Sequence, residues 1–442
     1  MKHIIFLALP LGISLLPRAA VAQDAPHIAH PFTLAQVWEK AIQNNKRIQI
    51  QQLQTDASDE EVKDAVTDRL PEITADGEYA RVSKMPIYEK GLFNAPAQYP
   101  VLHSTYGVGI DAYLNLYNGN KTNLNIAQKK TTAKMRRLQT AQTTADVKLA
   151  VAVAFLQLKR SLVFKDLLLS DIISQQKQLA KIEQLRKNGV VLKSDVLRAQ
   201  LQLSRQQLQL NTIDNDIAIA NQRLDVAIGE PDDFSITPQG DVQADSVKVD
   251  TYDNCLVQAN AHAYKEKISE EETHLHELQL KQAKGAYMPK VGLFANYTFS
   301  YPQILFYPYS PYLYSFGMAG VKASFSISGL YTNKHKVKAT EIELKQQEIE
   351  HQDTRDAISL SVNSYYLRLQ EAMHRVNVAQ TNVQQAIENS RIVNNTYFNQ
   401  TSLITDLLDA NNALLQTRFE LASAKIEVQI QYYQLQNAIG NL

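Results

Sequence analysis

Long stretches without glycine or proline are the feature that most constrains the fold of this chain. Five such stretches make up most of the 442 residues, and the last of them runs for 110 residues. A mean globular helix has only about 11 to 12 residues. Since glycine and proline are the residues that most readily interrupt a helix, very long helices are expected in place of about three compact domains of roughly 150 residues. The five stretches are 32–70, 120–188, 190–228, 241–284 and 330–439.

The N-terminal segment has the pattern of a secretory signal peptide over residues 1–22. It has a positive charge at Lys2, an apolar run over 4–16 and an A-x-A cleavage site that ends at Ala22. The apolar run is too short for a transmembrane helix. The alternative is an uncleaved anchor. In either case the pattern predicts export across the inner membrane.

Composition excludes several classes of protein. Lys+Arg and Asp+Glu balance at 45 each, so no basic surface for nucleic acid dominates the chain. A mean hydropathy of -0.28 is too polar for a polytopic helical membrane protein. The single cysteine, Cys255, excludes a disulfide framework within one chain and leaves no lipid-accepting cysteine after the signal peptide.

The chain contains an internal duplication. Residues 188–229 align without a gap on residues 399–440, and twelve of 42 positions are identical. At a similar offset, Leu70-Pro71 aligns with Met288-Pro289. A repeat of this length indicates two structural copies in tandem. The twelve shared pairs are Asn188/Asn399, Leu192/Leu403, Asp195/Asp406, Leu197/Leu408, Ala199/Ala410, Leu203/Leu414, Leu210/Leu421, Ile219/Ile430, Leu224/Leu435, Ala227/Ala438, Ile228/Ile439 and Gly229/Gly440.

The duplication predicts two repeats, 23–235 and 251–442, joined by a linker over 236–250. Glycine and proline residues near the join between the repeats indicate a loop there. Each copy is expected to contain a helix, two strands with a loop between them, a very long helix and a further helix after a short break. In the first copy, the first helix is predicted over 34–70, with a proline directly after it.

Four segments show the alternation of a β-strand with one apolar face. Apolar and polar or small residues alternate with a period of two over 72–79, 106–117, 291–300 and 321–327. Segments of about ten residues with this pattern are typical of outer-membrane barrels. The connection 301–314 adds five tyrosines and three prolines, a composition suited to the membrane interface and an external loop. A soluble sandwich with an aromatic loop is the alternative.

Four strands alone cannot close a membrane barrel. Known bacterial barrels need at least about eight strands, and an open edge in lipid leaves backbone groups unpaired. Three copies of the chain would supply twelve strands. The residues 120–187 would form a helical rod of roughly 100 Å, far longer than a bilayer requires. The predicted fold class is therefore mainly α, with four strands per chain for a membrane β-barrel.

These features resemble the TolC family of outer-membrane efflux proteins over essentially the whole mature chain. The paired segments NGVVLKSDVLRAQ and YFNQTSLITDLLDAN, the signal peptide and the order of helices and strands carry the resemblance. It implies a homotrimer, with a twelve-stranded barrel in the outer membrane of a Gram-negative bacterium and a twelve-helix tunnel in the periplasm. It also implies a passive duct that binds a periplasmic adaptor and an inner-membrane transporter.

The resemblance also implies a gate at the start of the last helix. Asp406 and Asp409 fall on the family positions that form acidic rings, and Tyr397 falls on one that helps to hold the inner helix pair closed. The alternative is that an aspartate in the first helical turn only complements the helix dipole. Asp195 repeats Asp406, which indicates a partly structural role for that position. Ser402 stands where a better-known member has a gate-locking arginine.

The turns between the long helices are the expected contacts for the adaptor. They lie at the far ends of the predicted rods, where a partner can reach them. A glycine in the first turn can take the left-handed conformation that a turn requires, which is its purely conformational role. The residues are Asn188, Gly189, Val190 and Val191 in the first turn, and Asn399, Gln400, Thr401 and Ser402 in the second.

Enzymatic chemistry finds little support, and no cofactor or metal is expected. His274 and His276 are two residues apart in a helical stretch, so they point to different faces.

Small-molecule efflux with a pump of the RND type is the favoured function. An exit duct for type I protein secretion with an ABC transporter is the alternative. A periplasmic coiled-coil scaffold or adaptor is an alternative that is not a channel, and it does not account for the four strands.

Overall fold

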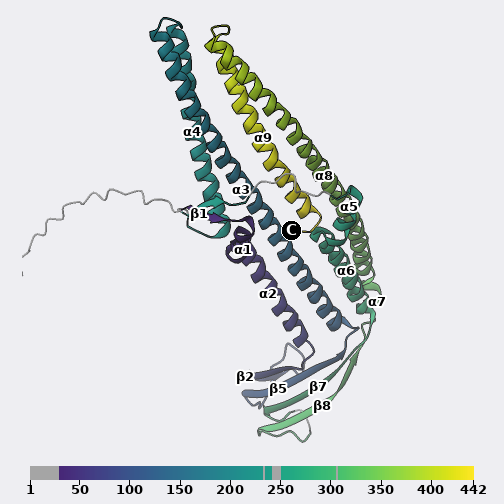
Figure 1. The fold of residues 1–442 in the computed structure, drawn as a ribbon. Coiled ribbons are helices and arrows are strands. Elements are labelled where there is room, and N and C mark those ends of the chain that lie inside the picture. The colour runs from purple at the N-terminus through teal and green to yellow at the C-terminus, as the bar shows by residue number, and fades with distance from the viewer. Residues whose placement is uncertain (1–28, 232–233, 241–249, 305–306) are drawn as a thin grey trace, which may run out of the picture.

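The computed structural model describes residues 29–231, 234–240, 250–304 and 307–442. The predicted signal peptide therefore lies outside the described residues, as does most of the predicted linker. The described chain forms an elongated molecule, with helices along its long axis and a four-stranded sheet at one end (Figure 1). The chain passes from helices to sheet and back twice, as the duplication predicts.

Two helical hairpins form the end of the molecule opposite the sheet. The first consists of α3 (Lys121–Lys187) and α4 (Lys193–Ile228), and the second of α8 (Lys334–Phe398) and α9 (Ile404–Ala438). α3 has 67 residues and α8 has 65. At a rise of about 1.5 Å per residue, each is roughly 100 Å long. The prediction of very long helices is confirmed, because the stretches free of glycine and proline continue as helix up to each turn.

The prediction of one unbroken helix over 34–70 is wrong. The structure has α1 (Leu34–Asn44) and α2 (Lys46–Thr67), separated by Asn45 in an extended conformation. The Asn45 side chain accepts a hydrogen bond from the Arg47 amide at 3.0 Å and donates one to the Ala227 carbonyl at 2.9 Å. It therefore caps α2 and ties the break to α4.

The second repeat has the same break at the equivalent place. α5 (Tyr252–His262) and α6 (Tyr264–Lys284) are separated by Ala263, whose backbone is also extended. Ala263 and Asn45 differ by 218 positions, the offset of the two Leu/Met-Pro pairs found in the sequence. The duplication thus extends to the interruption of the first helix.

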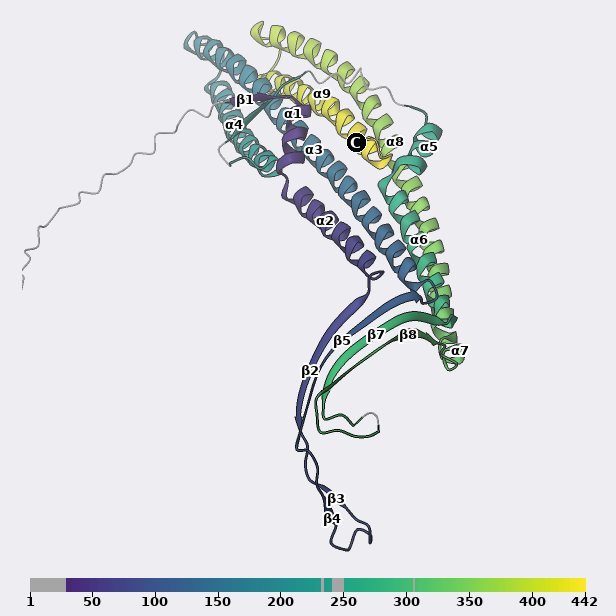
Figure 2. The ribbon, with the colours of Figure 1, turned by 90° about the horizontal axis from the view of Figure 1, so that it is seen from below.

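The four predicted strands form one antiparallel sheet in the order β2, β5, β7, β8 (Figure 2). The strands are β2 (Glu72–Arg81), β5 (Ser104–Tyr117), β7 (Lys290–Tyr301) and β8 (Tyr314–Ser324). Paired residues share a face, so Ile110, Ala75 and Tyr297 lie in one row on the apolar face. The neighbouring row on the polar face contains Asp111 and Asn296.

The last strand differs from its prediction at both ends. β8 starts at Tyr314 and ends at Ser324, so Phe325 and Ile327 lie beyond it. In addition, Phe316 pairs with Thr298 and Met318 pairs with Asn296, so the first half of β8 places apolar side chains on the face that carries Asp111. The alternation over 321–327 identifies the strand but not its limits, because the apolar residues change face within β8: Phe316 and Met318 lie opposite to Val321 and Ala323.

Several short elements have no counterpart in the predicted order. β1 (Ala29–Phe32) pairs in parallel with β6 (Ser235–Pro238), beside the connection between the repeats. β3 (Met85–Ile87) pairs with β4 (Ala97–Tyr99) and extends the loop between β2 and β5 away from the sheet (Figure 2). A 3-10 turn, η2 (Gly285–Tyr287), precedes β7, and α7 (Gly329–Thr332) precedes α8.

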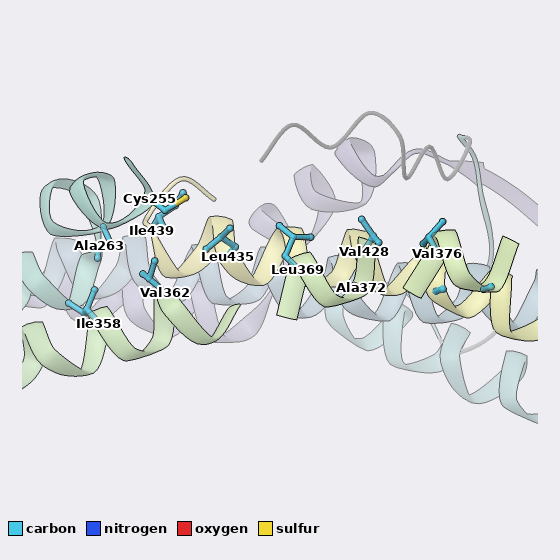
Figure 3. Packing of buried hydrophobic residues seen from close by; sticks show 13 residues of the cluster. Cys255, Ala263, Ile358, Val362, Leu369, Ala372, Val376, Val428, Leu435 and Ile439 are labelled. Atoms are coloured by element: carbon cyan, nitrogen blue, oxygen red, sulfur yellow. The ribbon is translucent and has the colours of Figure 1, made fainter. Parts of the chain in front are cut away.

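Buried apolar residues are distributed along the helices in separate clusters. The largest joins α5, α8 and α9 and contains the free thiol of Cys255 (Figure 3). Val362, Leu369 and Ala259 are among its most buried members. No described helix carries an apolar stretch long enough to cross a bilayer. The buried clusters show that the helices pack on one another along apolar stripes.

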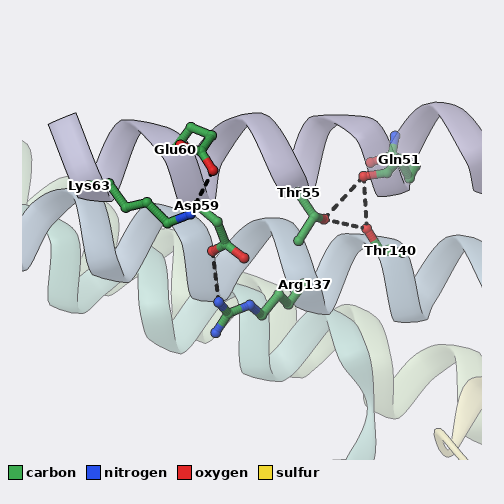
Figure 4. A network of polar contacts seen from close by, with 7 residues as sticks. All are labelled: Gln51, Thr55, Asp59, Glu60, Lys63, Arg137 and Thr140. Carbon is green, nitrogen blue, oxygen red and sulfur yellow. Dashed lines mark hydrogen bonds and ion pairs between the residues drawn. The ribbon is translucent and has the colours of Figure 1, made fainter.

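α2 packs on the sheet-proximal half of α3 through polar contacts (Figure 4). Arg137 donates to Asp59 at 2.7 Å, and the hydroxyls of Thr55 and Thr140 lie 2.9 Å apart. Thr140 also donates to the backbone carbonyl of Gln51 at 3.2 Å. These contacts fix the register of α2 along α3, just before the chain enters β2.

Candidate functional site

The turns at the ends of the two hairpins have the same geometry. Gly189 has φ of 76° and Gln400 has φ of 64°, so both take the left-handed conformation at equivalent positions of the duplication. The Val190 amide donates to the Leu185 carbonyl at 2.9 Å, and the Thr401 amide donates to Thr396 in the same way at 2.8 Å. These bonds are the 6→1 bonds of a Schellman motif, which ends a helix by satisfying its last carbonyls.

The predicted adaptor contacts lie at the end of the molecule farthest from the sheet (Figure 1). Six of the eight residues are exposed, while Val191 and Ser402 are half-buried. Val191 packs on the apolar cluster that also contains Tyr397, so the first turn is connected to the second hairpin. The Ser402 hydroxyl accepts a hydrogen bond from Thr396 at 3.1 Å, within its own turn.

Asp406 and Asp409 are both exposed at the start of α9, but their surroundings differ. The Asp406 carboxylate accepts a hydrogen bond from the Leu403 amide at 3.1 Å and so caps the helix. Asp409 forms no hydrogen bond or ion pair with the described residues. The i, i+3 spacing places both carboxylates on one face of α9. Part of the role of Asp406 is therefore structural, whereas helix capping does not explain Asp409.

Tyr397 is buried at the end of α8, with 5% of its surface exposed. Its hydroxyl has no hydrogen-bond partner among the described residues. Burial and the negative charge of Asp195 raise the pKa of Tyr397 to about 12. Asp195 lies in the first turn of α4, so the electrostatic interaction joins the two hairpins. The surrounding cluster consists of Ile182, Val196, Ala199, Ile404, Leu407 and Leu408.

Sequence reasoning missed a polar network between the hairpins. Gln178 of α3 donates to Asn394 of α8 at 3.3 Å and accepts from Asn411 of α9 at 3.0 Å. Asn411 accepts in turn from Ser390 at 2.9 Å. These residues line a groove of about 380 Å³ with Lys181 at its edge. The signal in the sequence was the pair Asn411-Asn412, two poor helix formers in consecutive positions of a long helix.

The two histidines form no common site. His274 Nδ1 lies 3.4 Å from a Glu277 carboxylate oxygen, and His276 Nδ1 lies 3.0 Å from the Glu272 carbonyl. Within the described residues, no three His, Cys, Asp or Glu side chains come together as metal ligands.

Solved structures of other proteins superpose on this chain over most of its length. CusC superposes with a TM-score of 0.78 at 14% identity over 96% of each chain. VceC of Vibrio cholerae, an outer membrane protein, superposes with a TM-score of 0.75 at 15% identity over 92% of this chain and 96% of its own. The outer membrane channel CmeC of Campylobacter jejuni gives 0.74 at 14% identity over 92% and 85%. At these identities the likeness shows the fold.

No curated protein matches the chain by sequence. The family model for outer membrane efflux proteins, however, matches residues 37–230 and 274–441. The two matched stretches correspond to the two repeats and include the sheet, all four long helices and both tips. The chain belongs to the outer membrane efflux protein family.

Proposed function

We propose that three copies of this chain form an exit duct in the outer membrane of a Gram-negative bacterium. The observation that carries the proposal is a four-stranded sheet with two unpaired edge strands, joined directly to helices of roughly 100 Å. β2 has ten residues and β8 has eleven, so both edges are long and would recruit further strands. Pairing β8 of one copy with β2 of the next closes a twelve-stranded barrel.

The faces of the sheet suit this assembly. Val108, Ile110 and Ile73 on the apolar face are 61%, 55% and 67% exposed in the single chain. Exposed apolar area of this extent is unfavourable in water and favourable in lipid. Asp111 and Thr298 lie on the opposite face, which would line the duct. A soluble scaffold would leave the apolar face in water.

The helices would continue the duct as a twelve-helix tunnel in the periplasm. Each chain contributes two hairpins, and their exposed turns are the surfaces that an adaptor can reach. The resting tunnel would be constricted where Asp406 and Asp409 of three copies meet. We propose small-molecule efflux with an adaptor and an RND-type pump as partners. An ABC transporter gene beside this one would instead support protein secretion.

Disulfide trapping tests the assembly. In a Cys255→Ser background, Ala319→Cys on β8 is combined with cysteine at Ile73, Ala75 or Gly77 on β2. Because the four positions lie on one face of the sheet, at least one pair is expected to give covalent trimers in oxidised membranes. Ala295→Cys on the central strand β7 replaces Ala319→Cys as the control, since its neighbours belong to the same chain. The absence of trimers from every β8–β2 pair contradicts the proposal.

A further inference from the structure

Lysines gather where the sheet meets the helices, and most of them have no carboxylate partner. This junction is formed by the starts of α3, β7 and α8 and the end of β8 (Figure 2). Lys284 and Lys338 share one partner, Glu341, at 3.5 Å and 3.4 Å. The lysines that form no ion pair with the described residues are Lys121, Lys290, Lys322, Lys334 and Lys336.

Three of these lysines lie close enough to affect one another. Lys121 is half-buried, and its Cγ would lie 3.5 Å from a Cβ placed on Gly285, so its aliphatic stem packs over that glycine. Burial lowers the pKa of the Lys121 ammonium, and the positive charges of Lys290 and Lys336 lower it further. The chain thus holds three like charges together at one place.

The sheet register adds a fourth lysine on the same side. Lys290 pairs with Ser324 and Lys322 pairs with Gly292, which makes the two lysines diagonal neighbours on one face. That face is the polar one, and it carries Asn296 further along β7. In the proposed assembly, it faces the duct.

Two helix ends strengthen the positive potential. α3 begins at Lys121 and α8 begins at Lys334, and neither helix has an acidic residue in its first turn. Neither start has a side-chain cap on its N-cap residue. Helix N-termini carry partial positive charge and usually attract aspartate or glutamate. The same departure from local preference at two helices that both start at this junction is expected at a functional site.

The neighbouring carboxylates do not balance these charges. Glu341 is already paired with two lysines. Asp68 accepts a hydrogen bond from Asn125 at 3.2 Å, and the residue after it, Arg69, adds a positive charge beside the first turn of α3. Glu72 lies on β2, two strands away from Lys290. Lysine and arginine side chains therefore outnumber carboxylates at the junction, and this excess of positive charge favours the binding of an external anion.

We propose that Lys121, Lys290 and Lys336, with Lys322 at the edge, form a binding site for a phosphate-bearing anion. A phosphate group offers several acceptor oxygens and more than one negative charge to converging ammonium groups, and the partial positive charge of the two helix starts complements it. The placement of the site inside the duct rests on the proposed function. The site itself is contained in one chain. The phosphate can belong to a dissolved anion in the duct or to the headgroup of an anionic phospholipid.

Calorimetric titration of the purified full chain in neutral detergent tests the site, with inorganic pyrophosphate as the probe. The triple variant Lys121→Gln, Lys290→Gln, Lys336→Gln is expected to weaken binding by about tenfold or more, since each charge-assisted contact alone is worth about that factor. The control variant carries Lys177→Gln, Lys187→Gln and Lys193→Gln, which remove the same number of charges from exposed lysines of the hairpins. The affinity of this control for pyrophosphate is expected to equal that of the wild type.

A second arm distinguishes the source of the phosphate. Phospholipid retained after purification is measured for the wild type and the triple variant. Phosphatidylglycerol that is retained by the wild type and lost from the variant, without pyrophosphate binding, assigns the site to a lipid headgroup. Equal behaviour of wild type and variant in both arms overturns the site. Light scattering reports the oligomeric state separately, so a monomer that still binds pyrophosphate contradicts the trimer and not the site.

Discussion

Asp406 and Asp409 are neighbours on one helix face, yet only one of them stabilises the helix on which it lies. The Asp406 carboxylate caps the Leu403 amide, while Asp409 extends into solvent without a partner in the described chain. Asp195, the counterpart of Asp406, lies in the first turn of α4, and the counterpart of Asp409 is Arg198. The acidic character at 409 is thus particular to the second hairpin.

The two aspartates are expected to differ in their effect on local stability. Asp406→Ala removes the cap and should lower the free energy of opening at the start of α9 by about 1 kcal/mol, which is about fivefold in hydrogen exchange. Asp409→Ala should leave exchange there unchanged. Hydrogen exchange of residues 400–410, followed by mass spectrometry, measures both. Equal acceleration in the two variants contradicts the assignment of the cap to Asp406.

The Tyr397 phenol should ionise only at a pH well above the ordinary pKa of tyrosine. Because the pKa of Tyr397 is raised to about 12, this phenol stays neutral in the folded state at pH values at which it would be ionised in an unfolded chain. Its contribution to stability is present below about pH 10 and is lost as the pH rises towards 12. Absorbance titration of the wild type minus Tyr397→Phe should show one phenol per chain ionising near pH 12. A difference curve centred near pH 10 contradicts its burial.

The site residues could be predicted only in part. Family resemblance predicted Tyr397, Asp406 and Asp409 as gate residues; the structure places them at the end of the molecule away from the sheet, and the gate itself stays a prediction. The burial of Tyr397 could not be predicted, because it depends on Ile182 and Val196 from the other hairpin. Such contacts link residues about 200 positions apart, and the periodicity of a helix does not indicate which distant helix packs against it.

At the scale of elements, the two turns show how one geometry is built from different residues. Gly189 takes the left-handed conformation without strain, whereas Gln400 takes it with a side chain present. The hydrogen bonds around the two residues are equivalent. The duplication has therefore retained the backbone of the turn, although three of its four side chains differ between the repeats.

Substitution of Gly189 tests the function of the first turn. A Cβ at this position meets no atom within 4 Å, so the penalty for Gly189→Val is confined to the backbone and is about 1 to 2 kcal/mol. Gly189→Asn is the matched control, since asparagine tolerates the left-handed region. Gly189→Val should raise drug accumulation in cells while the amount of trimer in the membrane is unchanged, and Gly189→Asn should act like the wild type. Normal accumulation with Gly189→Val contradicts docking at this turn.

The elements themselves were largely predictable, and their interruptions were not. Continuous helix over Lys121–Lys187 and Lys334–Phe398 follows from local preference, because these stretches contain neither glycine nor proline. The break at Asn45 arises because its side chain reaches Ala227 in α4, which is a tertiary contact. Likewise, β3 and β4 are strands of three residues each, too short for a periodic pattern.

At the scale of the whole molecule, the surfaces of a single chain suit assembly with further copies. Within the described residues, the sheet has two unpaired edges and an exposed apolar face, and the long helices carry exposed aspartates at one end and lysines without ion pairs at the other. Three copies around one axis would pair the edges, cover the apolar face with lipid and place the aspartates of the second hairpin around the tunnel. The charges along the duct would then alternate, negative at the tips and positive at the junction.

Single-channel recording of the purified protein in a planar bilayer tests this account most directly. The wild type should show low conductance, cation preference and block by a trivalent cation added at the tip side, because three copies of Asp406 and Asp409 would bind such an ion together. The double variant Asp406→Asn, Asp409→Asn should weaken the block and reduce the cation preference while the trimer remains intact. Block and selectivity that are unchanged in the double variant, or a protein that forms no channel, would contradict the account.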